Sequence, residues 1–405
     1  MIDLKSVKEN LADWKSGLAR KRATVDLDAV VSTYDTWLAL SQEVEQLRGE
    51  RNEAAKAKDI EKGKQVGEKL KGLEEDLRTK EAALNSLALQ IPNLPLAEVP
   101  DGGEDDGKVV ETSGVLPELA NPKDHIELGT SLGILDIDRG VKVSGSRFYF
   151  LKNEGVEVEF ALARWIFDLV KSEGFELLAG PQLVGKQIME SAGYLGQAEE
   201  EIYKTNDDLY LIGTSEQTIL GYHMDEVIEV PKRYAAFSTC FRREAGSYGK
   251  DVKGIIRTHQ FDKIEMFSYV APEAAANEHE FLVSLEEEIL RKLEIPYQKV
   301  LIAAGDLGMS AAKKFDLESW IPSQKRYRET HSCSNCTDWQ ARGAKIRYKT
   351  EEGKNEFVYT LNGTAVAVGR LLVALLENHQ QPDGSVKIPA ILHPYLSFKE
   401  IKVKS

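Results

Sequence analysis

The chain has 405 residues, of which 42% are hydrophobic and 29% are charged, and its formal net charge at pH 7 is −14. This is the composition of an ordinary soluble protein. No stretch approaches the roughly 20 apolar residues of a membrane-spanning helix. The first residues, MIDLKSVKENLADW, lack the apolar core of a signal peptide. We therefore expect a cytoplasmic protein with no membrane partner, large enough for two or three domains.

The negative charge is spread unevenly along the chain. Residues 1–100 carry 16 Lys and Arg against 18 Asp and Glu, whereas the remainder carries 36 against 48. Between Arg48 and Lys71 the balance reverses, with eight basic residues against five acidic ones. An acidic protein can present such a local basic stripe to phosphates, so the total charge does not exclude a nucleic-acid partner.

Residues 26–91 predict two long helices, because apolar residues recur there at close to heptad spacing. These residues are Val30, Tyr34, Trp37, Val44 and Leu47, and then Val66, Leu70, Leu73, Leu77, Leu84, Leu87 and Ile91. The break around Asp59–Gly67 contains Gly63 and Gly67, which predict a hairpin between two antiparallel helices. A stripe this narrow indicates a projecting coiled-coil arm. A dimerisation rod or spacer is an alternative reading, and its basic tip is also compatible with an ordinary solvated surface.

The segment 91–107, IPNLPLAEVPDGGEDDG, is rich in proline and glycine and predicts a linker. We place one domain at 1–100 and a second at 101–405. The second mixes predicted helices and strands, with few strand–helix repeats. The helices are Glu157–Glu173 and Pro272–Leu293, and the strands are Lys232–Phe241, Phe261–Val270, Tyr297–Ile302 and Glu356–Leu361. This order favours an α+β fold built on an antiparallel sheet.

The segment from Phe241 to Phe267, FRREAGSYGKDVKGIIRTHQFDKIEMF, has the residue types of a nucleotide site. Two arginines and Glu244 follow the first strand. The two-residue period of the second strand places one set of side chains on a common face, with Arg257 joining if the strand extends back: Phe261, Lys263 and Glu265. Arginine suits phosphate oxygens, an aromatic ring suits a base, and a carboxylate suits an amine. A solvated strand face with salt bridges is the alternative.

The segment TLNGTAVAVGRLLVALLENHQQPDGSVKIPAIL predicts a strand ending at Leu361 and a turn at Asn362–Gly363. An apolar helix from about Ala365 to His379 follows, interrupted by Arg370. A buried guanidinium without a partner costs several kcal/mol, so Arg370 must meet an anion or water. That anion is either a ligand or a carboxylate of the protein.

These segments resemble the second and third motifs of class II aminoacyl-tRNA synthetases, and their wording resembles bacterial-type seryl-tRNA synthetases. The resemblance rests on FRREAGSYGKDVKGIIRTHQFDKIE, GDLGMSAAKKFDLESWIPSQKRYRE, SCSNCTDWQAR, LNGTAVAVGR and ENHQQPDGSVKIP. It implies a class II antiparallel sheet flanked by helices, with an N-terminal antiparallel coiled-coil arm. The implied activity is ATP-dependent attachment of L-serine to tRNA(Ser) through a seryl-adenylate, and also to selenocysteine tRNA where one exists. Segment Glu157–Val184 resembles the interface-forming first motif and implies a homodimer.

The resemblance also implies roles for individual residues. Serine would be bound by Thr214, Glu216, Arg242, Glu265, Asn362 and Thr364. ATP would be bound by Arg242, Arg243, Glu244, Arg257, Phe261, Glu329, Thr330, His331, Ser332 and Arg370, with Mg²⁺ on Glu329 and Ser332. The catalytic residues would be Arg242, Glu329 and Arg370. Thr330-His331 departs from the Ile-Ser of many bacterial relatives, so a solvent-facing loop histidine is the alternative for His331.

The remaining alternatives concern metal and activity. The three cysteines, Cys240, Cys333 and Cys336, include only one C-x-x-C pair. Structural zinc needs four ligands, so we expect none here. An armless homologue that loads amino acids onto carrier proteins would lack the predicted arm. A non-catalytic RNA-binding or scaffold relative is expected to have lost arginines and carboxylates that this chain retains.

Overall fold

The computed structural model describes residues 2–196, 199–245 and 253–404. The chain forms two compact units, Met1–Leu94 and Pro95–Ser405, and each is described separately below. The division falls at the beginning of the segment predicted as a linker. Within the described ranges, no helix is both long enough and apolar enough to cross a membrane.

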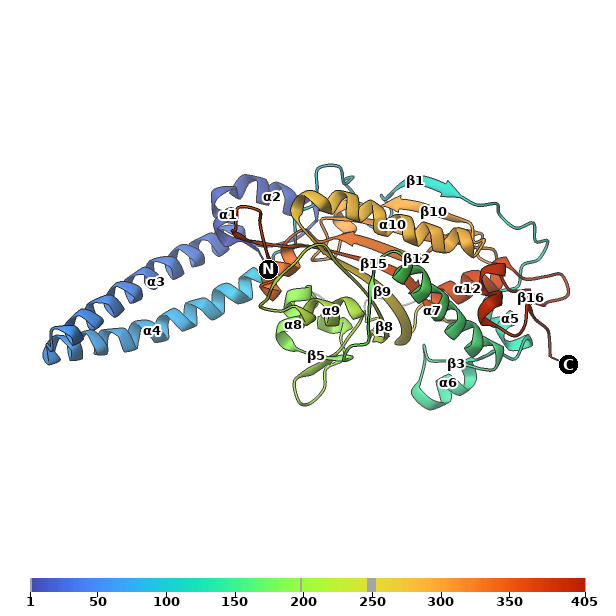
Figure 1. The fold of residues 1–405 in the computed structure, drawn as a ribbon, viewed down its shortest axis with the longest axis horizontal. Coiled ribbons are helices and arrows are strands. Elements are labelled where there is room, and N and C mark those ends of the chain that lie inside the picture. The colour runs from blue at the N-terminus through green and yellow to red at the C-terminus, as the bar shows by residue number, and fades with distance from the viewer. Residues whose placement is uncertain (1, 197–198, 246–252, 405) are drawn as a thin grey trace. The chain divides into compact units, whose positions relative to one another are not determined.

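The first unit consists of four helices: α1 (Leu4–Glu9), α2 (Leu11–Arg20), α3 (Leu27–Lys56) and α4 (Ile60–Ala88). The two long helices run side by side in opposite directions (Figure 1). An apolar cluster joins the first three helices to Ile91, which follows α4: Val7, Trp14, Leu18, Leu27, Val30 and Ile91. Leu87 of α4 packs against this cluster. Farther along, a seam of Val44, Val66 and Leu70, flanked by Leu47, Leu73 and Leu77, joins α3 to α4. The predicted antiparallel helical arm is confirmed.

The position of the hairpin turn was predicted wrongly. The chain turns at Ala57–Asp59, where Lys58 has a positive φ of 57° and the Asp59 side chain caps α4 by accepting from Lys62 N. Gly63 and Gly67 lie inside α4, and a Cβ on either would meet nothing within 4 Å. Each glycine costs up to about 1 kcal/mol in a helix. Packing of the adjacent seam against α3 overrides that preference.

The second unit is built on an eight-stranded sheet with the order β1-β10-β11-β12-β15-β9-β8-β4. In that order the strands are Lys108–Ser113, Tyr297–Leu301, Lys313–Ile321, Arg326–Asn335, Tyr359–Ala367, Gln260–Val270, Lys232–Phe241 and Glu176–Leu178. All neighbouring strands are antiparallel except β4 and β8, which are parallel. The predicted α+β class with an antiparallel sheet is confirmed.

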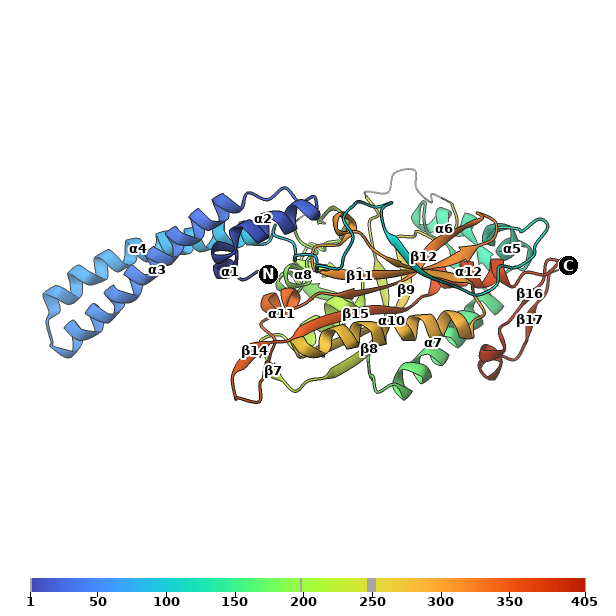
Figure 2. The ribbon, with the colours of Figure 1, turned by 90° about the horizontal axis from the view of Figure 1, so that it is seen from above.

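Helices cover this sheet and bury the main core. α7 (Glu154–Ser172), α10 (Ala275–Lys292) and α12 (Val368–Asn378) pack on its strands, and α10 lies along β15 (Figure 2). Shorter helices are α5 (His125–Ser131), α6 (Ile137–Ser144), α8 (Lys186–Ala192), α9 (Ser215–Tyr222) and α11 (Trp339–Ala344). Small strands are β2 (Leu135–Asp136), β3 (Phe150–Leu151), β5 (Leu183–Gly185), β6 (Leu209–Leu211), β7 (Val227–Ile228), β13 (Arg347–Lys349), β14 (Asn355–Phe357), β16 (Val386–Lys387) and β17 (Glu400–Ile401).

The third-motif region also differs from its prediction. Asn362–Gly363 does not form a turn but lies inside β15, and α12 begins at Val368 instead of Ala365. β15 is central, hydrogen-bonded to β12 on one side and β9 on the other. Pairing on both sides outweighs the turn preference of the Asn-Gly pair. As a result, Asn362 and Thr364 project from a rigid strand.

Candidate active site

A cavity of about 430 Å³ lies over the middle strands of the sheet. Its walls come from β9, β11, β12, β15, the start of α9 and α12, Arg242 directly after β8, and the return segment, residues 254–259, which leads back to β9. It gathers every residue predicted to bind serine or ATP except Arg243 and His331. These lining residues are Thr214, Glu216, Arg242, Glu244, Arg257, Phe261, Glu265, Glu329, Thr330, Ser332, Asn362, Thr364 and Arg370.

The two-residue period of β9 explains one wall of the cavity. Phe261, Lys263 and Glu265 face the cavity, whereas Ile264 and Met266, which alternate with them, belong to the apolar core on the other side of the sheet. The predicted mixed face is therefore neither a core face nor a solvated outer surface. It is the floor of a cavity.

One of the two exceptions, His331, has a structural cause. His331 is 1% exposed on β12 and lies opposite the core residue Leu317. Burial lowers the pKa of His331 to about 4, so the ring is neutral at pH 7. A register shift between β11 and β12 places Glu329 and Ser332 toward the cavity and His331 away from it. The loop interpretation of His331 is wrong, and neither His331 nor Arg243 lines the cavity.

Among the residues that the structure describes, three cation–carboxylate pairs have both members in the cavity lining. Arg370 Nη1 is 2.9 Å from Glu329 Oε1, and Arg257 Nη1 is 2.9 Å from Glu244 Oε2. Lys263 pairs with the buried Glu265. The anion that Arg370 meets is thus a protein carboxylate, that of Glu329, and both side chains line the cavity. A ligand bound in the cavity can therefore contact both Arg370 and Glu329.

Arg242 interacts electrostatically with one carboxylate of each pair: Glu244, Glu329 and Glu265. Its guanidinium carbon is 5.2 Å from the centre of the Phe261 ring, and its Nε donates to Gly213 O at 3.3 Å. This separation is a direct cation–π contact, which orients the guanidinium relative to the Phe261 ring. Arg242 is the first residue after β8, so the end of a central strand fixes its position.

The electric field differs between the two ends of the cavity. Desolvation favours the neutral form of Glu329, but Arg370, Lys314 and Arg242 outweigh it and lower the pKa of Glu329 to about 2. At the other end, burial and the nearby Glu265 raise the pKa of Glu216 to about 7. One end therefore holds a permanent anion among cations, and the other holds a carboxylate that titrates near neutrality.

Hydrogen bonds fix the end of the cavity that contains Glu216. Thr214 caps α9, with its hydroxyl accepting from Glu216 N at 3.3 Å. Glu216 accepts a hydrogen bond from Gln340, whose Oε1 accepts from Thr360 at 2.7 Å. Glu216, Gln340 and Thr360 are all buried. This network holds the Glu216 carboxylate in one orientation.

Sequence reasoning missed several of these residues. Strand alternation places Lys263 on the cavity face but predicts no role for it, and no motif marks Lys314 or Gln340, which line or support the cavity. Lys314 is packed against Asp316 at 3.1 Å on β11, and Asp316 raises its pKa against the effect of burial. Alternation along Lys313–Ile321 could have placed Lys314 and Asp316 on one face. Nothing in the local sequence places Gln340 beside Glu216.

Family models match both units. Residues 1–95 match the seryl-tRNA synthetase N-terminal domain, and residues 199–379 match the tRNA synthetase class II core domain (G, H, P, S and T). The sheet and cavity are accordingly those of a class II aminoacyl-tRNA synthetase.

Similar proteins narrow this class. The chain is 45% identical over 420 residues to a serine–tRNA ligase of Mycolicibacterium vanbaalenii, covering 100% of both chains. It is 47% identical to that of Corynebacterium kroppenstedtii, covering 95% of this chain and 91% of the relative. A seryl-tRNA synthetase from Pyrococcus horikoshii complexed with ATP superposes with a TM-score of 0.91 at 36% identity, covering 100% of both chains. The chain belongs to the seryl-tRNA synthetase family, the class II enzymes that join serine to tRNA.

Proposed function

We propose that this cavity activates L-serine with ATP and then transfers the seryl group to tRNA(Ser). The observation that carries the proposal is that arginines suited to a triphosphate and buried carboxylates suited to a small amino acid line one cavity. A solved relative from Naegleria fowleri, with a TM-score of 0.88 at 32% identity and coverage of 100% of this chain and 99% of that one, is a complex with AMP. Nucleotide complexes of two relatives support the ATP end of the cavity.

In the proposed complex, ATP takes over the arginines from the protein's own carboxylates. Arg257 and Arg370 bind the β- and γ-phosphates, since a planar guanidinium matches phosphate oxygens. The adenine stacks on Phe261, with Glu244 at its edge. Arg242 lies at the junction, where it contacts the α-phosphate and the serine carboxylate. The ion pairs of Arg257 and Arg370 with cavity-lining carboxylates support this exchange of partners.

Mg²⁺ fits one part of the cavity. Glu329 stays ionised because its pKa is about 2, and with the Ser332 hydroxyl it offers the oxygen ligands that Mg²⁺ prefers. In the described ranges no three His, Cys, Asp or Glu residues are grouped to hold a metal. We infer that phosphate oxygens and water complete the coordination. Mg²⁺ bound there would neutralise phosphate charge.

The first step is attack of a serine carboxylate oxygen on the α-phosphorus of ATP, which breaks the bond to the β-phosphate and releases pyrophosphate. The attacking carboxylate is already ionised at pH 7, so the step needs no general base. Arg242 stabilises the charge that accumulates on the α-phosphate, and Arg257 and Arg370 stabilise the departing pyrophosphate. In the second step a terminal ribose hydroxyl of tRNA attacks the seryl carbonyl and AMP leaves.

The amino-acid end of the cavity is proposed to recognise serine by its polar groups. The ammonium of serine pairs with carboxylates, and its side-chain hydroxyl forms hydrogen bonds with Glu265 and Thr364. The pocket is completed by Thr214, Glu216 and Asn362. Glu265 is 2% exposed. With alanine as the substrate, the oxygens of Glu265 and Thr364 would lose the hydrogen bonds proposed with the serine hydroxyl, which can cost ~10⁴-fold in rate. The extra methyl of threonine has to be excluded by the pocket wall.

The arm is proposed to bind tRNA(Ser), and selenocysteine tRNA where one exists. Basic residues at its tip are exposed: Arg51, Lys56, Lys58, Lys62, Lys64, Lys69 and Lys71. They suit recognition of the RNA backbone and its shape, and such binding weakens steeply with salt. We also propose a homodimer through the first-motif segment. In support of that surface, Phe160 on α7 is 65% exposed and Leu177 on β4 is 42% exposed.

A pyrophosphate-exchange assay across the twenty amino acids tests the proposed reaction. We expect ATP-dependent exchange with serine and at least ~10³-fold weaker exchange with alanine, because the hydroxyl partners would be left unpaired. Aminoacylation of tRNA(Ser) is measured on the same protein. Exchange with another amino acid in preference to serine, or none with any, would contradict the proposal.

A further inference from the structure

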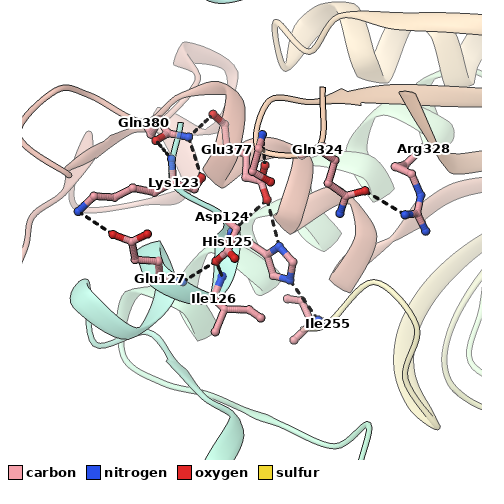
Figure 3. A network of polar contacts seen from close by, with 12 residues as sticks. Lys123, Asp124, His125, Ile126, Glu127, Ile255, Gln324, Arg328, Glu377 and Gln380 are labelled. Carbon is pink, nitrogen blue, oxygen red and sulfur yellow. Dashed lines mark hydrogen bonds and ion pairs between the residues drawn. The ribbon is translucent and has the colours of Figure 1, made fainter. Parts of the chain in front are cut away.

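A buried histidine outside the cavity, His125, contacts both Glu377 of α12 and Ile255 of the return segment (Figure 3). His125 begins α5 and is 4% exposed. Its Nδ1 lies 3.1 Å from Glu377 Oε1, and its backbone N donates to the same oxygen at 3.0 Å. Glu377 is fully buried on α12, and its second oxygen accepts from Ser323 N at 3.0 Å. The carboxylate therefore has a fixed set of partners.

The other ring nitrogen of His125 faces a backbone amide. Ile255 N donates to His125 Nε2 at 3.3 Å (Figure 3). A nitrogen that accepts a hydrogen bond carries no proton, so this contact assigns the ring proton to Nδ1, which donates to Glu377. The imidazole is thus a directional bridge. It accepts from the segment that returns to β9 and donates to α12.

Gly254 is matched to this bridge. Its φ is +84°, and a Cβ built on it would lie 2.1 Å from His125 Nε2. A side chain at this position would therefore strain the backbone and collide with the ring. The chain lies directly against the imidazole at the point where it turns toward the cavity.

His125 is connected to two cavity-lining arginines, Arg257 and Arg370, through its two partners. Arg257 follows Ile255 by two residues and lines the cavity. Ile256 O accepts from Arg370 Nε at 3.3 Å. Arg370 and Glu377 both belong to α12, about two turns apart. His125, Ile255, Ile256, Arg370 and Glu377 thus close a ring of contacts between the return segment and α12.

We propose that His125 is a positioning residue for ATP binding: by accepting from Ile255 N and donating to Glu377, it holds Arg257 and Arg370 at a fixed separation. This role rests on the proposed function, because it assumes that these arginines bind the phosphates. The positioning role of His125 depends on Nε2, because the hydrogen bond that Nε2 accepts from Ile255 N fixes the return segment. The bond to Glu377 is partly duplicated by the backbone N of His125.

Two substitutions separate the two ring nitrogens. The side-chain amide of glutamine reaches about as far as Nε2, and that of asparagine about as far as Nδ1. His125→Gln can therefore still accept from Ile255, whereas His125→Asn keeps only the partner for Glu377. Calorimetry on the full chain gives the ATP dissociation constant, and pyrophosphate exchange gives the serine KM. We expect the ATP dissociation constant to rise about tenfold in His125→Asn and to stay within about threefold in His125→Gln, because one buried N–H loses its acceptor only in the former.

Gly254→Ala provides a second approach that leaves His125 in place. Its Cβ displaces the return segment from the ring, so ATP binding is expected to weaken at least tenfold while the serine KM stays unchanged. Thermal unfolding of all three variants reports on folding. Equal ATP affinities in His125→Asn and His125→Gln, whether normal or weakened, would overturn the positioning role, as would normal ATP affinity in Gly254→Ala. If the predicted ATP pattern appears but the wild type shows no serine-dependent exchange, the proposed function fails and the positioning role stands.

Discussion

The arm and the cavity use charge in opposite ways. In the arm, Val44 and Leu70 are buried in an apolar seam, while pairs such as Arg48–Glu74, at 2.9 Å, have side chains 49% and 41% exposed. Exposed pairs of this kind contribute little to stability. In the cavity, Lys263–Glu265 is almost completely buried, and burying charge costs free energy that its partner only partly returns.

This difference separates what holds each region together from what it presents to a ligand. The arm folds through its seam, and its basic residues can engage phosphates without unfolding it. The sheet and the start of α12 contribute walls of the cavity, and its arginines are paired with carboxylates that a ligand is proposed to replace. Substitutions in the cavity should therefore change chemistry more than stability. Substitutions at the arm tip should change only interactions with a large partner.

The largest expected effect is at the serine end of the cavity. Replacing Glu265 with Ala should lower serine-dependent pyrophosphate exchange by ~10⁴-fold, because it removes a buried acceptor for the substrate. ATP binding, measured by calorimetry, should stay close to wild type, since Glu265 makes no ion pair with Arg257 or Arg370, the arginines proposed to bind the β- and γ-phosphates. Exchange near the wild-type rate would remove Glu265 from the pocket.

Shortening the arm should give the next largest effect. Removing residues 44–72 and closing the gap with a short glycine-containing turn keeps the apolar base formed by α1 and α2. Aminoacylation of tRNA(Ser) should fall by ~10³-fold as the phosphate contacts are lost, with serine activation within about twofold of wild type. A matched full-length variant with Lys62, Lys64 and Lys69 changed to Gln should show part of the same loss. If the shortened protein charged tRNA normally, the arm would be a spacer.

Arg370 tests the phosphate end of the cavity. Arg370→Ala should raise the ATP dissociation constant by ~10- to 100-fold, the usual consequence of losing a charged hydrogen bond. Arg243→Ala is the matched control, because Arg243 is adjacent to Arg242 but does not line the cavity. The Arg243→Ala protein should bind ATP with the wild-type dissociation constant. Equal effects of the two substitutions would mean that Arg370 acts only through structure.

The smallest expected effect is a pH dependence. Burial and Glu265 raise the pKa of Glu216 to about 7 in the unliganded protein. The ammonium of serine favours the ionised form, so below pH 7 binding must displace a proton. The serine KM should therefore rise by ~10-fold from pH 8 to pH 6, and Glu216→Gln should remove that rise. A KM that falls toward acid pH would contradict this assignment.

The sequence predicted those features whose signal is local. The bounds of Lys232–Phe241 and the shared face of Phe261, Lys263 and Glu265 follow from strand alternation. Errors arose where distant contacts override local preference. Asn362–Gly363 forms no turn because β12 and β9 pair with β15 on both sides.

Other features depend on contacts that no local pattern records. The β11–β12 register shift turns His331 away from the cavity. Gln340 meets Glu216 across 124 positions, and His125 meets Glu377 across 252. Strand alternation and sequence motifs identify which side chains of a strand face the cavity. They do not identify which distant side chains hold those residues in place.

The central claim is that one cavity brings ATP and serine together. The most direct measurement is a single-turnover reaction with ATP labelled at the α-phosphate, in which the protein-bound product is separated and identified. We predict one seryl-adenylate per cavity with serine, almost none with alanine, and loss of the product in both Glu265→Ala and Arg370→Ala. Adenylate formed equally well from serine and alanine, or unaffected by either substitution, would contradict it.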